Sequence, residues 1–328
     1  MELREFGPDD AASIEAFVEV RNACLPIDAP WHHPDTPYRR RMEMIHAWDE
    51  EPGQHFLAHV AGELVGSVTI DASNYDNLDL AWLGLEIHPD HRRQGHGTAA
   101  LEAAYEICRE MGRPLLGIGG WDGEHTRGFA AATGFELKSQ AINRRQVLAE
   151  LPAGLVDKLY DDALAQAGDY ELLRFFGGTP DELMDDVARL TAAINDAPLD
   201  DLEFEDEAFP PERIRAYEHS QRESGFRFRR LVARHRATGE LAGHTVVTVD
   251  SERPQNGDQH DTAVVQKHRG HRLGVLLKAE MVRWLAEEEP ELATIDTWNA
   301  ESNDHMVFVN ELLGYRIMGR VLEFQRRI

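Results

Sequence analysis

The stretch Glu86-Ile-His-Pro-Asp-His-Arg-Arg-Gln-Gly-His-Gly-Thr98 decides the fold of this chain, because a related stretch occurs again further on. The second copy is Ala263-Val-Val-Gln-Lys-His-Arg-Gly-His-Arg-Leu-Gly-Val275. Arg92-x-x-Gly95-x-Gly97 matches Arg269-x-x-Arg272-x-Gly274 at a constant offset of 177 residues (269 − 92). Each copy follows an apolar segment and opens an amphipathic one. We therefore predict that a unit of strand, glycine-containing loop and helix occurs twice.

A loop of this kind presents several backbone N–H groups in a row at the positive end of a helix, which suits it to hold a diphosphate. Glycine lets the backbone approach the anion, and Arg92 and Arg269 add positive charge. The order Arg-x-x-Gly-x-Gly at a strand-to-helix junction, with Pro89 just ahead, resembles the pyrophosphate loop of the GNAT superfamily of acyl-CoA-dependent N-acyltransferases. The resemblance covers nearly the whole chain as two tandem copies.

Two other interpretations of the loop are weaker. Gly95-His-Gly97-Thr-Ala-Ala100 also fits the dinucleotide pattern G-x-G-x-x-G/A, but that pattern follows the first strand of a βαβ unit and needs an acidic residue about 20 residues later. Here the loop comes after several predicted strands, and the second copy keeps only one of the glycines. A helix that begins without any ligand is the other alternative, and it explains one copy more easily than two.

Composition limits the classes of partner. A chain of 328 residues is long enough for about two domains, and 42% hydrophobic residues allow each half an ordinary core. The formal net charge of −25 repels phosphate backbones and anionic membrane surfaces, so neither nucleic acid nor a membrane is an expected partner. An acidic protein attracts cationic small molecules such as amines, although a solvated acidic surface is the commoner explanation.

Cysteine usage and the N-terminus indicate a cytoplasmic protein. Cys24 and Cys108 stand far apart without C-x-x-C spacing, so neither a disulfide framework nor a zinc site is expected. His32 and His33 have no partner at a fixed spacing, and we predict no metal. The first ten residues have neither a basic region nor an apolar stretch, and no later run is long enough to span a bilayer.

Alternation and turn residues predict the same order of elements in each copy. The first copy has strands at 3–6, 54–60, 63–70, 78–88, 115–119 and from 134, and helices after 10, at 38–50, after the loop and at 124–133. The second has strands at 170–175, 226–234, 240–249, 261–265, 293–297 and from 314, and helices at 180–195, 210–223, after the loop and at 303–313. We predict domains at 1–150 and 170–328, joined by a helix within 151–169.

The resemblance implies the fold and the cofactor. Each domain is expected to be of the α/β (α+β) class, with a curved, mixed, mostly antiparallel sheet flanked by helices. Acetyl-CoA (coenzyme A) is the implied cofactor, and Asn299 and Asn303 resemble the family's asparagine contacts to its pantetheine arm and phosphates. The expected cofactor-binding residues are Ile87, His88, Arg92, Arg93, Gln94, Gly95, His96, Gly97 and Thr98 in the first copy, and Val264, Val265, Arg269, Gly270, His271, Arg272, Leu273, Gly274, Val275, Asn299 and Asn303 in the second.

Catalytic candidates come from the strand before each loop. Glu86 and His88 in the first copy, and His260 and Asp261 in the second, are candidate bases, and each has the alternative of being a polar residue on the exposed side of a strand. By resemblance, backbone N–H groups near Ile87 and near Val264 or Val265 stabilise the oxyanion. The family's tyrosine acid is absent, because Ala130 and Asn310 occupy its two positions; Asn310 is the candidate that assists the leaving thiolate.

The resemblance implies an N-acetyltransferase that moves an acetyl or related acyl group from acetyl-CoA to a primary amine of a small, cationic acceptor. The acidic run Asp201–Glu207 is a candidate acceptor-binding segment, with a solvated surface as the alternative. The first copy has the better glycine loop, whereas the second has Asn299, Asn303 and Asn310. We expect the second copy to be catalytic. The alternative function is an acyl-CoA-binding sensor or scaffold without turnover, in either case a monomer or homodimer.

Overall fold

The chain folds into two compact units, each built around one β-sheet. In the computed structural model, which describes residues 1–328, unit 1 comprises Met1–Ala141, Leu199–Asp206 and Gly319–Ile328. Unit 2 comprises Ile142–Pro198 and Glu207–Met318. The main division lies at residue 141 rather than near 150, and two short segments from the second half of the chain belong to unit 1. The mixed α/β class, with a mostly antiparallel sheet flanked by helices, is confirmed.

The sheet of unit 1 has the strand order β1-β2-β3-β4-β5-β12. Adjacent strands are antiparallel, except that β4 and β5 run parallel. The strands are β1 (Glu2–Phe6), β2 (Gln54–Val60), β3 (Glu63–Asp71), β4 (Leu80–Ile87), β5 (Leu115–Trp121) and β12 (Arg316–Arg327).

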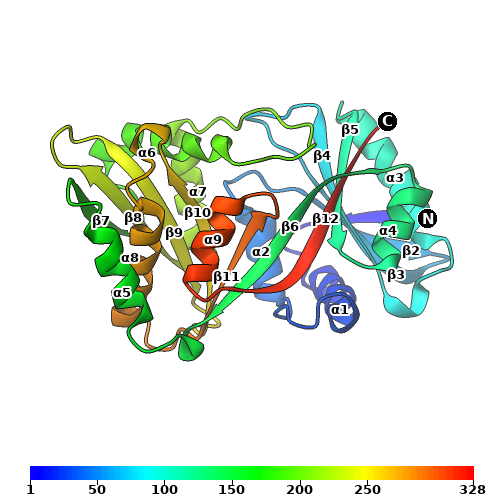
Figure 1. Cartoon of the computed structure of the whole chain (residues 1–328). Helices are drawn as coiled ribbons and strands as arrows, with labels where there is room; N and C mark the ends of the chain where they lie inside the picture. The colour runs from blue at the N-terminus through cyan, green and yellow to red at the C-terminus, as the bar shows by residue number, and fades with distance from the viewer. The chain divides into compact units, whose positions relative to one another are not determined.

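Helices cover both faces of the unit 1 sheet (Figure 1). Successive residues of a strand point to opposite faces, so Leu57 packs with the first pair of helices and Phe56 with the second. Both cores are apolar, which explains why buried strand residues here form runs rather than strict alternation. The first pair is α1 (Ala11–Asp28) and α2 (Pro37–His46), and the second is α3 (His96–Glu110) and α4 (Glu124–Ala132).

Unit 2 repeats this plan with the strand order β7-β8-β9-β10-β11-β6. The strands β7 to β10 are antiparallel to their neighbours, and β10 and β11 run parallel. The strands are β6 (Glu136–Val147), β7 (Tyr170–Phe176), β8 (Phe226–His235), β9 (Leu241–Asp250), β10 (Asn256–Val264) and β11 (Thr294–Ala300).

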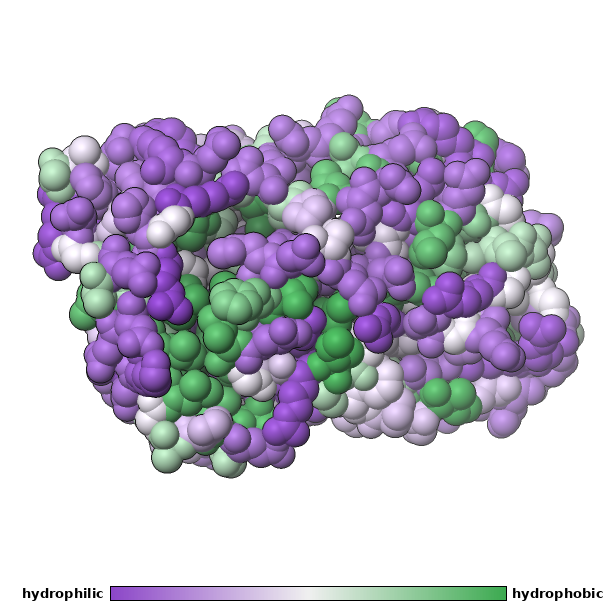
Figure 2. Space-filling view, in the orientation of Figure 1, coloured by the Kyte–Doolittle hydropathy of each residue, from purple (hydrophilic) through white to green (hydrophobic).

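Two helix layers also enclose the sheet of unit 2. On β8, Leu231 packs into the core beneath α5, α8 and α9, and Val232 packs into the core beneath α6 and α7. Figure 2 shows apolar side chains gathered on unit 2 over α5, α8 and α9. The helices are α5 (Leu155–Leu164), α6 (Met184–Thr191), α7 (Pro211–Glu223), α8 (Leu273–Glu288) and α9 (Asp304–Leu312), and the short 3-10 helices of the chain are η1 (Pro89–His91), η2 (Leu148–Glu150), η3 (Asp181–Leu183), η4 (Ala192–Asp196) and η5 (Gln266–His268).

The last strands of the two copies are exchanged between the units. β6 and β12 are both 12 residues long and correspond at an offset of 180 residues (316 − 136). β12 pairs with β5 of unit 1, from Val321 opposite Trp121 to Arg327 opposite Leu115. Residues 142–147 of β6 belong to unit 2, beside β11. The sequence prediction, in which each last strand closes its own domain, differs here because two strands of equal length at equivalent places in the repeat can each pair with either sheet edge.

The predicted linking helix is α5, and it belongs to unit 2. Leu159 and Ala163 of α5 are buried in the core that also contains Leu276 and Val282 of α8. The helix is therefore part of one hydrophobic core rather than a free connection between two domains.

Candidate functional site

Each unit contains one pair of parallel strands that separates halfway along its length. β4 and β5 pair from Leu80–Leu115 to Leu83–Ile118, after which β4 continues to Ile87 with no partner on that side. In unit 2, β10 and β11 pair from Asn256–Thr294 to Gln259–Thr297, and β10 then continues to Val264. We call the opening beyond each pair the wedge. A wedge exposes backbone N–H and C=O groups that the sheet leaves unpaired, at the carboxyl ends of parallel strands where ligands bind in open sheets.

A single N–H group at the end of each leading strand points into the wedge. The N–H of His88 donates to the Val65 carbonyl at 3.0 Å, and the N–H of Val265 donates to the Ala242 carbonyl at 2.9 Å. Because successive N–H groups of a strand point to opposite sides, those of the preceding residues point away from β3 and β9. These preceding residues are Ile87 and Val264, so of the expected oxyanion donors Val264 has the available group and Val265 does not.

The loop after each wedge has two residues with a left-handed backbone. In unit 1 these are Arg93 (φ 62°) and Gly95 (φ 83°), and in unit 2 they are Gly270 (φ 87°) and Arg272 (φ 57°). Glycine and arginine are thus exchanged between two equivalent positions. Arg272, which stands where the first copy has Gly95, therefore has a positive φ. A non-glycine residue in this conformation costs about 1–2 kcal/mol.

The two loops form cradles of free N–H groups at the starts of α3 and α8. The N–H groups of residues 93–98 and of residues 270–275 have no acceptor within the protein. The first N–H groups that donate along the helices are those of Ala99 in α3 and Leu276 in α8. Six consecutive N–H groups at the positive end of a helix form a site for an anion such as a diphosphate. These cradles contain Gln94, His96, Gly97 and Thr98 in unit 1 and His271, Leu273, Gly274 and Val275 in unit 2.

Arg92 and Arg269 hold the loops in place. The Nε of Arg92 donates to the Ile87 carbonyl at 3.0 Å, and its guanidinium pairs with Asp28 at the end of α1 at 2.6 Å. In the same way, Arg269 donates to the Val264 carbonyl at 3.1 Å and pairs with Asp196 at 2.6 Å. Both arginines are therefore engaged with the protein itself, which fixes the geometry between wedge and cradle.

Gly97 and Gly274 occupy the same position in the two loops, but the atoms around each glycine differ. A Cβ atom at Gly97 would lie 3.2 Å from the Phe129 ring, whereas one at Gly274 would meet no atom within 4 Å. Helix packing therefore requires the first glycine. The second borders open space at the start of α8, which leaves room for a ligand.

In unit 1 the predicted bases are engaged in structural contacts. Glu86 forms an ion pair with Arg21 of α1 at 3.1 Å. The Nδ1 of His88 accepts a hydrogen bond from the Asp90 N–H at 3.3 Å and caps η1. A carboxylate paired with arginine is a weak proton acceptor, since the pair stabilises its charged form.

Aromatic side chains pack against the end of β5 in unit 1. Trp31 and Trp121 form an edge-to-face pair with ring centroids 5.2 Å apart, and His32 lies 6.1 Å from Trp121. A Cβ atom at Gly319 would lie 2.1 Å from the Trp31 ring, so the packing there is tight. The segment that contains Trp31 and His32 thus covers the strand end beyond the wedge.

Unit 2 has a β-bulge at its wedge that unit 1 lacks. Gln259 pairs with Val247 and Thr262 with Thr245, so β10 has one extra residue here, and His260 and Asp261 lie in the bulge. The register of β4 with β3 is regular throughout. The offset between the copies changes accordingly, from 176 before the bulge (259 − 83) to 177 after it (269 − 92). A bulge redirects side chains and is common next to active sites.

His260 is fixed within the protein. Its Nδ1 lies 2.5 Å from the Tyr217 hydroxyl on α7, and its Nε2 lies 3.2 Å from the Thr248 hydroxyl. Burial lowers the pKa of His260 to about 3, so the ring is neutral at physiological pH. Burial also raises the pKa of the Tyr217 hydroxyl well above its ordinary value. The sequence alone did not identify Tyr217, because no motif connects α7 with the bulge.

Asp261 is the other candidate base of unit 2. It makes no hydrogen bond or ion pair within the protein, and its side chain is half-buried. Burial raises the pKa of Asp261 above its ordinary value, and the charge of Arg230 offsets part of this rise. Arg230 itself is paired with Glu218 at 2.6 Å. A carboxylate with a raised pKa and no partner is suited to accept a proton from a substrate.

The asparagines of unit 2 divide into two roles. Asn303 is the N-cap of α9, where its Oδ1 accepts a hydrogen bond from the Met306 N–H at 3.1 Å. Asn310 is fully buried, and its Nδ2 donates to the Asn299 Oδ1 at 3.2 Å. Asn299 lies on β11 two residues beyond Thr297, the last residue paired with β10, so Asn310 and Asn299 meet beside the wedge.

The acidic run Asp201–Glu207 lies in unit 1, except for its last residue. Residues 199–206 belong to unit 1, where the Glu203 N–H donates to Gln325 at 2.7 Å and the Glu203 carboxylate pairs with Arg327 at 2.7 Å. Phe204 packs near Trp82, with ring centroids 6.0 Å apart. Residues 201–206 thus form a surface strap on unit 1, Glu207 begins a segment of unit 2, and the binding of an acceptor by this run stays a prediction.

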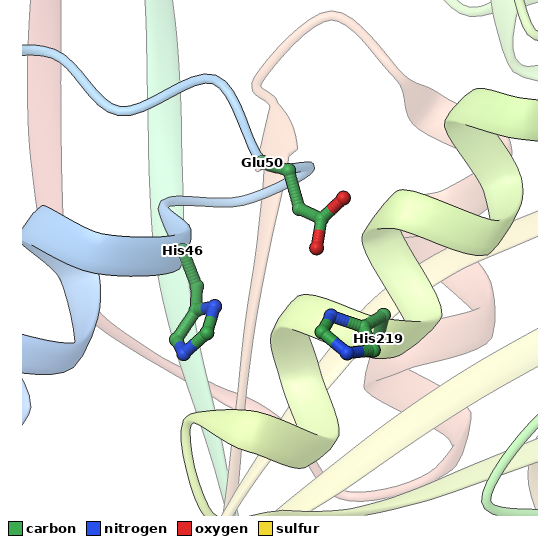
Figure 3. A group of neighbouring side chains, drawn as sticks. All are labelled: His46, Glu50 and His219. Atoms are coloured by element: carbon green, nitrogen blue, oxygen red, sulfur yellow. The ribbon is translucent and has the colours of Figure 1, made fainter.

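Figure 3 draws His46, Glu50 and His219, which come from different units. His46 ends α2 and Glu50 lies four residues later, both in unit 1, whereas His219 lies on α7 of unit 2. Neither unit by itself supplies all three of these side chains.

Comparison with known proteins agrees with the repeated wedge and cradle. Residues 14–135 match the model of the acetyltransferase (GNAT) family. The chain has the tandem GNAT fold. A tandem GNAT protein from the clavulanic acid biosynthesis pathway is 22% identical with a TM-score of 0.81, and the match covers 99% of this chain and 98% of that one. No curated protein matches the chain.

Two further solved structures share the fold. A GCN5-related N-acetyltransferase from Sphaerobacter thermophilus is 14% identical with a TM-score of 0.71, covering 99% of this chain and 95% of that one. A GCN5-related glucosamine N-acetyltransferase region of a fungal β-N-acetylglucosaminidase is 15% identical with a TM-score of 0.69, covering 98% of this chain and 38% of that one. The predicted GNAT resemblance is confirmed, by the family model for residues 14–135 and by the fold for the whole chain. None of the helices combines the length and apolar composition that a membrane span needs.

Proposed function

We propose that unit 2 of this tandem GNAT protein transfers an acetyl or related acyl group from acetyl-CoA to a primary amine of a small, cationic acceptor. The observation that carries the proposal is Asp261, a half-buried carboxylate without a partner in the bulge of β10. It lies between the separated strands and a cradle of six free N–H groups, residues 270–275.

The proposed chemistry needs three groups of unit 2. Asp261 accepts a proton from the amine, whose nitrogen then attacks the thioester carbonyl carbon and forms the C–N bond. The Val264 N–H donates to the oxyanion of the tetrahedral intermediate. The C–S bond breaks, the electron pair leaves with sulfur, and the nitrogen gives its second proton to water. We assign Asn310 to the departing thiolate. The cradle at 270–275 holds the diphosphate of the coenzyme and so places the thioester in the wedge.

A cationic acceptor follows from the charges. Asp261 at the wedge is an unneutralised carboxylate, and the whole chain carries a formal net charge of −25. Both favour an approaching ammonium over an anionic acceptor. The ammonium must lose a proton before it can attack, and Asp261 is positioned both to attract it and to take that proton.

Unit 1 supports a second, non-catalytic function, because its cradle is intact while its wedge has no free base. Residues 93–98 present the same run of free N–H groups, but Glu86 is paired with Arg21 and His88 caps η1. We propose that unit 1 binds acyl-CoA without turnover, as a sensor or scaffold.

An amine panel with acetyl-CoA tests the proposed function. Free coenzyme A thiol is measured after incubation of the full chain with primary amines that differ in charge. The expected result is thiol release with cationic amines, together with an acetylated amine of the expected mass. Tight binding of acetyl-CoA by calorimetry without thiol release from any amine would support the sensor function alone.

A further inference from the structure

Lys278 occupies an unusual place in unit 2. It lies on α8, is 2% exposed, and donates a hydrogen bond of 2.6 Å from its Nζ to the Oδ1 of Asn310. Its Nζ also lies 4.6 Å from the centre of the Tyr315 ring. No carboxylate pairs with it. A buried ammonium without a counter-ion is costly, so its position calls for a compensating anion nearby.

The neighbouring titratable groups do not supply that anion. Asp296 of β11 is the acidic residue that acts on Tyr315, and both of its oxygens are bound by Arg145 of β6, at 2.6 and 2.8 Å. Burial raises the pKa of the Tyr315 hydroxyl, which keeps that group neutral. Burial lowers the pKa of Lys278 to about 7.

Asn310 connects this charge to the wedge. Its Oδ1 accepts from Lys278 on the buried side, and its Nδ2 donates to Asn299 on β11, beyond the point where β10 and β11 separate. An amide with its oxygen bound to a cation is a stronger N–H donor, since hydrogen bonds in a chain polarise one another. The equivalent residues of unit 1, at offsets of 177 and 180, are the buried Leu101 and Ala130.

From this arrangement we infer that Lys278 is a positioning residue for thiolate departure: it polarises Asn310, whose amide N–H stabilises the negative charge on sulfur as the thioester C–S bond breaks. The sulfur leaves with the electron pair and afterwards takes a proton from water. The first proton of the ammonium has gone to Asp261, and the second, from the acylated nitrogen, goes to water. No proton passes through the asparagine. The inference deepens the proposed function, because it rests on the thioester lying in the wedge of unit 2.

The variants K278M and N310A test the connection. Methionine has a similar length and no charge, so K278M should fold at least as stably as the parent. Folding lowers the pKa of Lys278 from 10.5 to about 7, so the unfolded chain holds this proton more tightly than the folded one. The stability of the parent should therefore rise with pH between these two values, and that of K278M should not. In turnover assays we expect K278M to lower kcat on the order of tenfold, with KM for acetyl-CoA little changed.

Two further readouts separate a positioning role from a structural one. The kcat of the parent should fall as pH rises and Lys278 loses its proton. The kcat of K278M should not show this fall. If the lysine acts through the asparagine, K278M should have little further effect in the N310A background, so the two losses should be far from additive. Additive losses, or an unchanged pH profile, would overturn the inference.

The thiol of bound coenzyme A gives a readout that needs no turnover. Its titration is followed by the ultraviolet absorbance of the thiolate, in a T98E background, which places a carboxylate at an exposed position of the unit 1 cradle. We expect the parent to lower the pKa of the bound thiol by about one unit relative to K278M, which corresponds to a tenfold preference for the thiolate. A lowered thiol pKa without turnover of any amine would sink the proposed function and leave this inference standing. A thiol pKa that K278M does not change would sink the inference even if turnover is found.

Discussion

Unit 1 and unit 2 share a wedge, a cradle and an arginine clamp, yet they differ at the places where chemistry is done. Unit 2 has a one-residue bulge that contains Asp261, whereas β4 of unit 1 is regular. Behind its wedge, unit 2 has Lys278 and Asn310, whereas unit 1 has Leu101 and Ala130. The comparison teaches that a coenzyme cradle can be repeated without the acid–base groups that use the coenzyme.

Removal of the free carboxylate should have the largest effect. We expect D261N to lower kcat on the order of 10²–10³-fold, because the attacking amine loses its proton acceptor. E86Q in unit 1 is the matched control and should leave turnover nearly unchanged, since Glu86 is neutralised by Arg21. Steady-state thiol release measures both. Equal losses in the two variants would remove the distinction between the units.

The pH dependence provides a check on the same residue. Turnover should rise with pH as Asp261 loses its proton, and the rise should lie above the ordinary aspartate range because burial raises the pKa of this group. Because the pKa of Asp261 is higher in the folded than in the unfolded chain, the protonated side chain stabilises the fold at low pH. This contribution to stability disappears as pH rises through the folded pKa. D261N should therefore be slower than the parent, yet no less stable near neutral pH.

An intermediate effect is expected at the cradles. In unit 2, G274E places a carboxylate beside the free N–H groups, and we expect acetyl-CoA turnover to fall about 10- to 100-fold. G274Q has nearly the same shape without the charge and should lose much less. The matched change in unit 1 is T98E, at an exposed position of its cradle. If T98E abolished turnover while G274E left it intact, the assignment of catalysis to unit 2 would be wrong.

The smallest effect is expected at the exchanged loop positions. R272G relieves a left-handed backbone at a non-glycine residue and should stabilise the chain by about 1 kcal/mol, whereas G95A imposes the same strain and should destabilise it by a similar amount. No atom lies within 4 Å of a Cβ at Gly95, so the backbone alone accounts for the change. Urea unfolding monitored for each variant measures both shifts, and shifts of the same sign would contradict the strain argument.

The repeat at an offset of 177 residues was enough to predict the fold, because the loop pattern, the hairpins and the helices are local features. The strand exchange was not predicted, since β6 and β12 have the same length and the same place in the repeat, and the choice between two sheet edges depends on distant contacts. The strap at 199–206 was hidden for the same reason: Glu203 and Glu205 look like any acidic run until Arg327 and Asn77 are near them.

The candidate site was only partly visible in the sequence. His260 and Asp261 were predicted because they precede the loop, but the bulge that separates their roles requires knowing the register with β9. Lys278 interrupts an otherwise apolar helix face between Val275 and Val282, which was a signal in the sequence that only the contact with Asn310 explains.

Amide hydrogen exchange with and without acetyl-CoA tests the central claim most directly, because it reports on the N–H groups that have no acceptor within the protein. We predict that acetyl-CoA slows exchange at Val264 and at residues 270–275 of unit 2. Slowed exchange confined to residues 93–98 of unit 1, or unchanged exchange at both cradles, would contradict the account.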